Sequence, residues 1–466
     1  MYTIPHFYNF KNLIKPLTHF ERQIKDISNP TISPSINNYT DVIEEIAITI
    51  KEVQIDLFKQ AIQKIDDNFK YMPGRVDRYY IKDNRERTII TPFGEITFNR
   101  TIYQCRQTNR CYTHVDRFLG LPKYDRYDPT VKSMIIELYA DQNSMIKVGK
   151  IIGDRIHSAF TLSEVRHYNA IPRQTIFNIV SKSKKYIPTP VRQEHTPSIL
   201  FIMADEKFIA TQGSNKKKVM AKAGVIFEGP SFKENRVHYE EKYYHLAITD
   251  DFWNEVYDKV CQRYDIDKIK QIYIMGDGAP WIKNGCKMFK RNKAKFVLDR
   301  FHLQQSMTRI TRDYENKKIL NSYIYGDDKK SFNKLSKNII KEADDSRQES
   351  IKQEFRYINN NWNAIQTMEK EVIVGCAMEG TISHTLASIF TSVPKAYKKE
   401  YLKLYLQNRE LKLNGYDLRK THLKTYNSTK EIVTDNKPLN FSMFEERTAF
   451  DKATSSNFIK GFIAKH

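Results

Sequence analysis

Two short apolar runs, each ending in an aspartate, decide how this chain folds: Ser198-Ile-Leu-Phe-Ile-Met-Ala-Asp205 and Gln271-Ile-Tyr-Ile-Met-Gly-Asp277. Runs of this length, bounded by turn residues, are typical of buried strands. Similar runs at 218–227, 243–249 and 295–298 predict three more strands. Because helical stretches separate several of these strands, the pattern predicts a mixed sheet covered by helices.

In the rest of the chain, changes in the spacing of the apolar residues mark where helices and strands alternate. Helix-spaced apolar residues predict helices over 40–70, 129–140, 144–153 and 172–185, and residues 87–103 predict a β-hairpin around Pro92-Phe-Gly94. Residues 112–121 are predicted to be a connector, and residues 303–370 to be helical. The predicted division is a helix and hairpin domain (1–125), a helical domain (126–190), a catalytic core (195–302 with 372–394), a helical insertion (303–371) and a basic C-terminal region (395–466).

Composition excludes several classes of protein. The chain has 466 residues, with 40% hydrophobic and 12% aromatic residues, which is typical of folded domains rather than disordered tails. No stretch approaches the length of a membrane span, and the N-terminus lacks the pattern of a secretory signal. Five cysteines without any C-x-x-C pair argue against a disulfide framework and a zinc knuckle. We therefore expect a multidomain protein of the cytoplasm.

The charge is strongly positive, since 76 Lys and Arg against 55 Asp and Glu give a net charge of +21. Such an excess favours polyanionic partners, although an AT-rich genome also encodes many lysines by default. Residues 395–437 hold 11 Lys and Arg against 5 Asp and Glu, interleaved with tyrosines that can stack on bases. In the alternative interpretation, this region is a solvated helix whose tyrosines pack inward.

The helix predicted over 172–185 is a second candidate for contact with DNA. Its polar side chains suit base edges and phosphates in a major groove, as in the last helix of a helix-turn-helix. The candidate residues are Arg173, Gln174, Thr175, Asn178 and Lys182. The gap before this helix is far longer than the usual tight turn, so a plain helical core unit is the alternative.

Three carboxylates stand out by their position. Asp205 and Asp277 each follow a predicted strand, where α/β folds place their chemistry, and Glu379 begins a helix-capable segment. Carboxylates that converge repel one another unless a divalent cation binds, and hard oxygen ligands suit Mg²⁺ or Mn²⁺. Taken singly, each residue has a structural alternative: a turn cap, a turn residue between two glycines, or the N-terminal acid of a helix.

Several longer strings together resemble one known family. They are Thr91-Pro-Phe-Gly-Glu-Ile-Thr-Phe-Asn-Arg-Thr-Ile-Tyr103, Ala204-Asp-Glu206, Gly276-Asp-Gly-Ala-Pro-Trp-Ile282, Leu298-Asp-Arg-Phe-His-Leu303 and Glu379-Gly-Thr-Ile-Ser-His384. In this order they resemble the Lre-type insertion-sequence (ISL) transposases of low-GC Gram-positive bacteria, a DDE-type family akin to Mutator-like transposases. The resemblance runs from about residue 40 to about residue 415.

The resemblance implies an α/β RNase H-like catalytic core with an all-α insertion, preceded by an α-helical and β-hairpin DNA-binding region. Asp205, Asp277 and Glu379 match the Asp-Asp-Glu triad, which would bind Mg²⁺ or Mn²⁺. The implied reaction is metal-assisted cutting of DNA at the element ends, followed by transfer of the freed 3′-OH into target DNA. The implied partners are double-stranded DNA, as terminal inverted repeats and target, and further copies of the chain, in association with the bacterial nucleoid.

The match leaves two points open. Asp299 and His302 correspond to a second family string near the DNA or the active site, with a purely structural role as the alternative. The family pattern has a histidine and two arginines where this chain has Thr381, Ile389 and Val393. Their replacement keeps a second function in view, a decayed or recruited DNA-binding protein without catalysis. A nuclease of the same fold, which nicks DNA without strand transfer, is a third.

Overall fold

A computed structural model describes residues 39–142, 144–157, 170–183, 190–212, 218–233, 236–371, 375–390 and 396–424. The chain forms two compact units. The first contains the described residues within Met1–Leu138, Ser144–Tyr186 and Arg419–His466, and the second those within Tyr139–Asn143 and Ile187–Leu418. Within the described residues, no helix is long and apolar enough to cross a membrane. The division into five domains made from the sequence stays a prediction.

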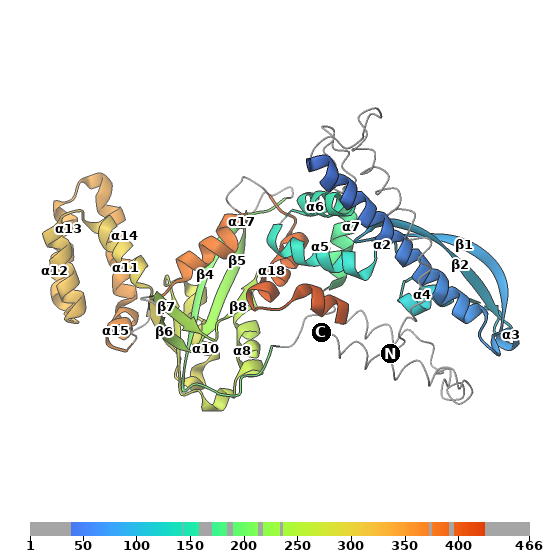
Figure 1. Cartoon of the computed structure of the whole chain (residues 1–466). Helices are drawn as coiled ribbons and strands as arrows, with labels where there is room; N and C mark the ends of the chain where they lie inside the picture. The colour runs from blue at the N-terminus through green and yellow to red at the C-terminus, as the bar shows by residue number, and fades with distance from the viewer. Residues whose placement is uncertain are drawn as a thin grey trace. The chain divides into compact units, whose positions relative to one another are not determined.

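The first unit is built on a long helix and a β-hairpin. Helix α2 (Tyr39–Lys70) packs on strands β1 (Tyr79–Thr91) and β2 (Gly94–Cys105), which pair antiparallel, and the short β3 (Cys111–Tyr112) extends the sheet (Figure 1). The core between them is made by Ile62, Ile65, Ile89, Ile96, Phe98, Val115 and Leu121. The helix predicted over 40–70 and the hairpin predicted over 87–103 are confirmed.

Further helices complete the first unit. The helices predicted over 129–140, 144–153 and 172–185 correspond to α5 (Pro129–Gln142), α6 (Met145–His157) and α7 (Arg173–Ser183). The connector predicted over 112–121 instead contains helix α4 (His114–Leu119). Gly120 ends α4 with φ 68, a left-handed conformation that suits glycine, so the sequence held a helix-stop signal that we had assigned to a loop.

The second unit contains a five-stranded mixed sheet in the order β10-β9-β4-β5-β8. Strands β4, β9 and β10 are parallel, whereas β5 is antiparallel to both β4 and β8. Their bounds are β4 (Ile199–Ala210), β5 (Lys218–Phe227), β8 (Tyr243–Ala247), β9 (Gln271–Gly276) and β10 (Lys295–Leu298). All five predicted strands are confirmed, but β4 continues to Ala210. Asp205 therefore lies within this strand, and the prediction that it directly follows the strand is wrong. The two-stranded ribbon of β6 (Gly229–Lys233) and β7 (Arg236–Glu240) was not predicted.

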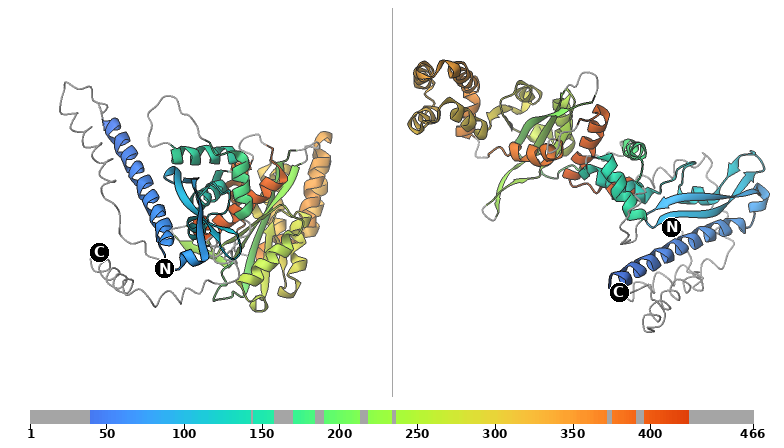
Figure 2. Two further views of the ribbon diagram at one scale, coloured as in Figure 1. Left: turned by 90° about the vertical axis from the view of Figure 1, so that its right-hand side faces the viewer. Right: turned by 90° about the horizontal axis from the view of Figure 1, so that it is seen from above.

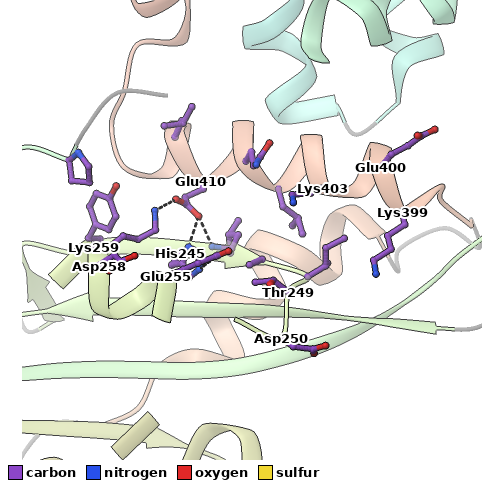
Figure 3. Close-up of a pocket in the computed structure, with 18 of the residues that line it drawn as sticks. His245, Thr249, Asp250, Glu255, Asp258, Lys259, Lys399, Glu400, Lys403 and Glu410 are labelled. Carbon is purple, nitrogen blue, oxygen red and sulfur yellow. Dashed lines mark hydrogen bonds and ion pairs between the residues drawn. The ribbon is translucent and has the colours of Figure 1, made fainter. Parts of the chain in front are cut away.

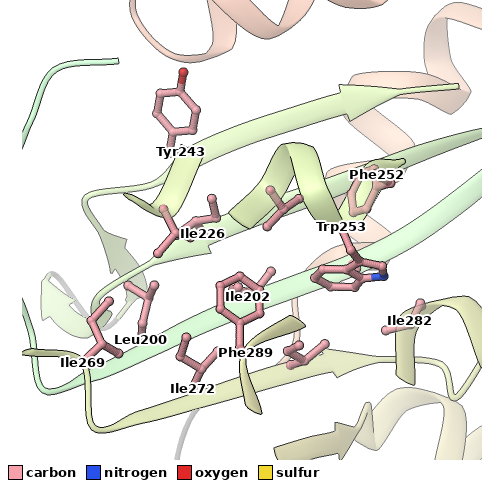
Figure 4. Close-up of a cluster of buried hydrophobic side chains, with 14 of the residues drawn as sticks. Leu200, Ile202, Ile226, Tyr243, Phe252, Trp253, Ile269, Ile272, Ile282 and Phe289 are labelled. Carbon is pink, nitrogen blue, oxygen red and sulfur yellow. The ribbon is translucent and has the colours of Figure 1, made fainter. Parts of the chain in front are cut away.

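Short helices cover one face of this sheet. Helices α8 (Phe252–Arg263), α9 (Pro280–Lys283) and α10 (Gly285–Met288) pack there (Figure 4). The sheet contributes alternate residues, since successive side chains of a strand point to opposite faces. The buried cluster includes Leu200, Ile202, Ile272 and Ile274 from the strands, Phe252, Trp253, Val256 and Ile282 from the helices, and Phe289, which directly follows α10. This core fixes β4, which carries Asp205, and β9, which Asp277 follows.

Five helices follow β10 in the region predicted to be a helical insertion. They are α11 (Arg300–Ile310), α12 (Tyr314–Tyr325), α13 (Lys329–Glu342), α14 (Asp345–Asn360) and α15 (Trp362–Glu371). Aspartates cap three of them, because the carboxylates of Asp299, Asp313 and Asp328 accept bonds from backbone amides of the first turn. Figures 1 and 2 show α12 to α14 standing away from the sheet of this unit.

The last described elements of this unit are α16 (Met378–Ile382), a π-helical turn (Ser383–Ala387), α17 (Ser388–Phe390) and α18 (Lys399–Leu413). On α18, Tyr405 is 1% exposed and packs edge-to-face on Phe390 and Tyr139. For Tyr405, the alternative that the tyrosines of 395–437 pack inward is confirmed, and the prediction that they stack on bases is wrong. Tyr426, another tyrosine of the basic region 395–437, lies outside the described residues.

The hairpin of the first unit depends on a half-buried carboxylate that pairs with a buried arginine. Asp116 on α4 pairs with Arg87 at 2.9 Å and also with Arg100, and Arg87 is only 7% exposed. We predict that Asp116→Ala lowers the free energy of unfolding by about 3–5 kcal/mol, since it leaves a buried guanidinium without its partner. Urea unfolding of the full chain measures this. The exposed Asp83–Arg85 pair is the matched control, because Asp83→Ala should leave stability nearly unchanged. Equal effects of the two changes would contradict the prediction.

Candidate active site

The strand register brings three aspartates to one edge of the sheet. Met203 on β4 pairs with Met275 on β9, and Leu298 on β10 pairs with Gly276 on β9. Counting onward along these parallel strands puts Asp205, Asp277 and Asp299 at the same level, on three adjacent segments of the sheet. The carboxyl ends of parallel strands are where α/β sheets bind ligands.

Two glycines let the backbone approach closely around Asp277. A Cβ on Gly276 would lie 2.7 Å from the carbonyl oxygen of Ala204, and Gly278 has φ +93. The carboxylate of Asp277 accepts a bond from the amide of Ala279 at 2.8 Å. Its carbonyl accepts a bond from the hydroxyl of Tyr357 on α14 at 2.5 Å. The loop that carries Asp277 is therefore held from both sides.

Asp205 is half-buried and surrounded by other acids. Its carboxylate accepts a bond from the amide of Glu206 at 2.7 Å. Burial raises the pKa of Asp205 to about 6, and repulsion from Asp277 and Glu206 adds to the effect. Burial also raises the pKa of Glu206, which accepts a bond from the indole nitrogen of Trp281 at 2.6 Å. We had not singled out Glu206, although it stands beside Asp205 in the Ala-Asp-Glu string.

Asp299 is 4% exposed and has a structural role, as its carboxylate caps α11 by accepting from the amide of Phe301 at 3.0 Å. Burial raises its pKa, and the charges of His302 and Glu379 both act on it. The half-buried Cys376 lies beside it, and its thiol forms a hydrogen bond with the carboxylate of Asp299. The sequence alternative of a cap is thus confirmed, while Asp299 also lies among the candidate site residues.

Glu379 is exposed in the first turn of α16. This segment lies against β4, since the amide of Ala377 contacts the sulfur of Met203 at 3.3 Å. The π-helical turn that follows is a rare feature, often found at functional sites. Two of the residues that replace basic side chains of the family pattern can be placed as follows. The hydroxyl of Thr381 donates to the carbonyl of Ala377, whereas Val393 lies outside the described residues.

The predicted triad is therefore gathered in one region but does not form a closed metal site. Among the residues that the structure describes, no three His, Cys, Asp or Glu side chains lie close enough to hold one ion. The donor chemistry nevertheless suits a hard cation, because carboxylate oxygens crowd together there, with Lys222, Lys283 and His302 near enough to offset part of their charge. Burial raises the pKa of Asp205, and repulsion from Asp277 and Glu206 adds to the rise.

The candidate DNA-reading residues lie on α7 in the first unit. Gln174, Asn178 and Lys182 are exposed and four residues apart, so they share one face, and Gln174 donates to Asn178 at 3.1 Å. Arg173 is also exposed, whereas Thr175 is half-buried. The opposite face of the helix is buried through Ile176, Ile179 and Val180.

A cavity of about 1250 Å³ in the second unit is lined by β8, α8 and α18 and by none of the predicted site residues (Figure 3). At its wall, Glu410 accepts from His245 at 2.9 Å, from the amide of Leu246 at 2.8 Å and from Lys259 at 2.6 Å. Glu255 contacts the other ring nitrogen of His245 at 3.0 Å. This cluster joins residues up to 165 positions apart, so no local signal could have identified it.

The cluster predicts a pH-dependent stability. Burial opposes protonation of His245, but hydrogen bonds to Glu255 and Glu410 outweigh it and raise the pKa of the ring above 6.5. Its stabilising contribution is thus complete below pH 6.5 and is lost as the pH rises through the raised pKa. Glu410, whose pKa is lowered by His245 and Lys259 despite its burial, loses its contribution only below pH 4.5.

We therefore expect the urea midpoint of the full chain to fall between about pH 6 and about pH 9, and this fall to be smaller in His245→Gln. Glu410→Gln should lower the free energy of unfolding by about 3–5 kcal/mol at any pH in this range, because Lys259 and His245 lose their buried partner. Identical pH slopes for the native chain and His245→Gln would show that the ring does not carry the effect.

Comparison with known proteins places the chain in a family. The model of an uncharacterised protein family (UPF0236) matches residues 35–427. Similar relatives are UPF0236 proteins of Caldanaerobacter subterraneus subsp. tengcongensis. One is 27% identical over 418 residues, covering 87% of this chain and 84% of the relative, and its name spans eleven loci. Another is 27% identical over 417 residues, covering 87% and 80%. The chain therefore belongs to the uncharacterised protein family UPF0236.

Proposed function

We propose that this chain is the DDE transposase of an insertion sequence. It cuts DNA at the ends of the element and transfers the freed 3′-OH into target DNA, with Asp205, Asp277 and Glu379 as the triad. The observation that carries the proposal is the register of β4, β9 and β10, which sets Asp205 and Asp277 level at one edge. Phosphoryl transfer needs such an anionic edge to hold the cations that balance phosphate charge.

Asp205 and Asp277 would hold Mg²⁺ or Mn²⁺, with Glu379 as the third carboxylate. When bound, the cations supply charge stabilisation for both the attacking and the leaving oxygen. The chain's own residues position these acids. Tyr357 holds the carbonyl of Asp277, and Gly276 and Gly278 let the backbone around it pack closely against Ala204 and Asn361.

Three further features support the proposal. The mixed five-stranded sheet, with five helices between β10 and Glu379, is compatible with an RNase H-like core that carries an all-α insertion. The name of one relative covers eleven loci in one organism, which is what an element that copies itself would leave. The exposed polar face of α7 is suited to reading the terminal repeats in a DNA groove. Assembly into a homo-oligomer on nucleoid DNA in the cytoplasm belongs to the same proposal, by analogy.

A second candidate function is DNA binding without catalysis, as in a decayed or recruited transposase. It is favoured by the exposure of Glu379 and by the absence of a closed group of metal ligands among the described residues. Thr381 and Ile389 also stand where the family pattern has basic side chains, which would weaken phosphate binding beside Glu379.

The experiment that separates the two is a strand-transfer assay with DNA from the flanks of the gene. We predict joined products that require Mg²⁺ or Mn²⁺, and a rate lowered by roughly a thousandfold or more in Asp205→Ala and Asp277→Ala. Asp267→Ala is the matched control, because this exposed acid precedes β9 at the opposite end of the strand. Joining retained by Asp277→Ala would refute the triad, whereas binding without cleavage under either metal would favour the second function.

The contact of α7 with DNA gives a separate prediction. Asn178→Ala should weaken binding to terminal-repeat DNA by about 1–3 kcal/mol and relax its preference over unrelated DNA, since an amide can read a base edge. Lys182→Ala should weaken both complexes alike, as expected of a phosphate contact. Competition binding with the two DNAs measures the difference. An unchanged preference in Asn178→Ala would remove α7 from sequence reading.

A further inference from the structure

Helix α13 carries four lysines on one face. Lys330, Lys334, Lys337 and Lys341 are spaced by four, three and four residues, which aligns them along the helix, and all four are exposed. We call this set the α13 lysine stripe. The opposite face of the helix is buried through Phe332, Ser336 and Ile339. Packing therefore fixes which way the stripe points, away from the neighbouring helices.

Nearby acids do not neutralise the stripe. Asp327 is engaged by Lys370 at 2.6 Å and by Trp362 at 2.7 Å. Asp328 caps α13 by accepting from the amide of Ser331 at 2.9 Å, although Lys330 is near enough to help lower its pKa. Among the ion pairs of the described residues, none joins a stripe lysine to a carboxylate. The lysines thus repel one another along the helix, which a polyanion would relieve.

The stripe is not a consequence of lysine-rich composition alone. Helix α14, which packs against α13, alternates its charges in the order Asp345, Arg347, Glu349, Lys352, Glu354 and Arg356. Helix α13 has five lysines and only Glu342 as an acid. A helix with mixed charges is typical of a solvated surface, whereas a single-sign face is the electrostatic footprint of a polyanion site.

A path of packed side chains connects the stripe to the carboxylate edge. Phe332 of α13 packs edge-to-face on Phe355 of α14, with ring centroids 5.6 Å apart. Asn359 donates to Asn333 at 2.8 Å. Tyr357 lies between Phe355 and Asn359 on the same helix, two positions from each, and donates to the carbonyl of Asp277. A backbone held on α13 would therefore be held in a fixed relation to Asp277.

We propose that the α13 lysine stripe binds the phosphate backbone of duplex DNA that is engaged at the carboxylate edge. This inference rests on the proposed function. From Lys330 to Lys341 the helix rises about 16 Å, which spans several phosphates of one strand at 3.4 Å per nucleotide. Lysine ammonium groups act as point charges on phosphates and read no bases. The stripe would thus hold DNA without regard to sequence, in contrast to the face of α7.

The test is fluorescence anisotropy of a labelled random-sequence duplex with the full chain, at several salt concentrations. Combined replacement of the stripe (Lys330→Gln, Lys334→Gln, Lys337→Gln, Lys341→Gln) should reduce the slope of log K against log salt by about 3. Affinity at about 0.1 M salt should fall at least about tenfold. The corresponding Lys→Arg variant should keep the native slope, because it keeps the charge.

A matched control removes the same charge elsewhere. This control combines four substitutions at exposed residues that precede the amino ends of β9 and β10, opposite the carboxylate edge. They are Lys270→Gln, Lys287→Gln, Lys290→Gln and Arg291→Gln. This variant should change the slope by less than about 1. Thermal melting followed by circular dichroism should show both Gln variants folded, since none of the eight side chains is buried.

The outcomes separate the stripe from the transposase. If the native chain binds duplex DNA and the stripe variant keeps the native salt slope, the proposal that the stripe binds DNA is overturned. The proposed transposase function is then unaffected. Equal losses in the stripe variant and the matched control would also overturn it, because net charge alone would then explain the effect. A stripe effect seen with RNA or phosphatidylserine vesicles, but not with duplex DNA, overturns the DNA assignment. If the native chain binds no duplex DNA, the stripe proposal and the transposase function are both overturned. Stripe-dependent binding without any strand transfer overturns only the catalytic function.

Discussion

The parallel pairing of β4, β9 and β10 is the constraint on which the rest of the second unit depends. It aligns Asp205, Asp277 and Asp299, residues far apart in the chain, at one level of one edge. The pairing is held by a buried core of aliphatic and aromatic side chains from the strands and from α8, α9 and α10. A slip of one residue in any of these strands would turn its aspartate to the other face of the sheet.

That alignment is electrostatically unfavourable in itself. Asp205 and Asp277 repel each other, and burial raises the pKa of Asp205 to about 6. The surrounding structure restrains these acids: Tyr357 binds the carbonyl of Asp277, Trp281 binds Glu206, and Asp299 is tied to the start of α11. A fold that keeps a crowded anionic edge in place, with Lys222, Lys283 and His302 offsetting part of its charge, is suited to a cation-dependent reaction.

Local sequence patterns predicted most elements but few of the contacts between them. The five strands, the hairpin around Pro92-Phe-Gly94 and the helix over 40–70 each follow from a period within one segment. The hold of Tyr357 on Asp277, across 80 residues, and of Glu410 on His245, across 165, depends on packing that no short window contains. Asp277 was found because it directly follows a strand, and Asp205 because an apolar run ends beside it, although β4 itself continues to Ala210. Their common level, and the place of Glu206 and Cys376 beside them, required the register.

The central claim is that the carboxylate edge is a divalent-cation site. Titration of the full chain with Mn²⁺, followed by the electron paramagnetic resonance of the free ion, tests it without any need for the natural DNA. The account predicts saturable binding to the native chain that is lost in Asp205→Asn and Asp277→Asn and kept in Asp267→Asn. Binding of equal strength in all four proteins, or none in the native chain, would contradict it.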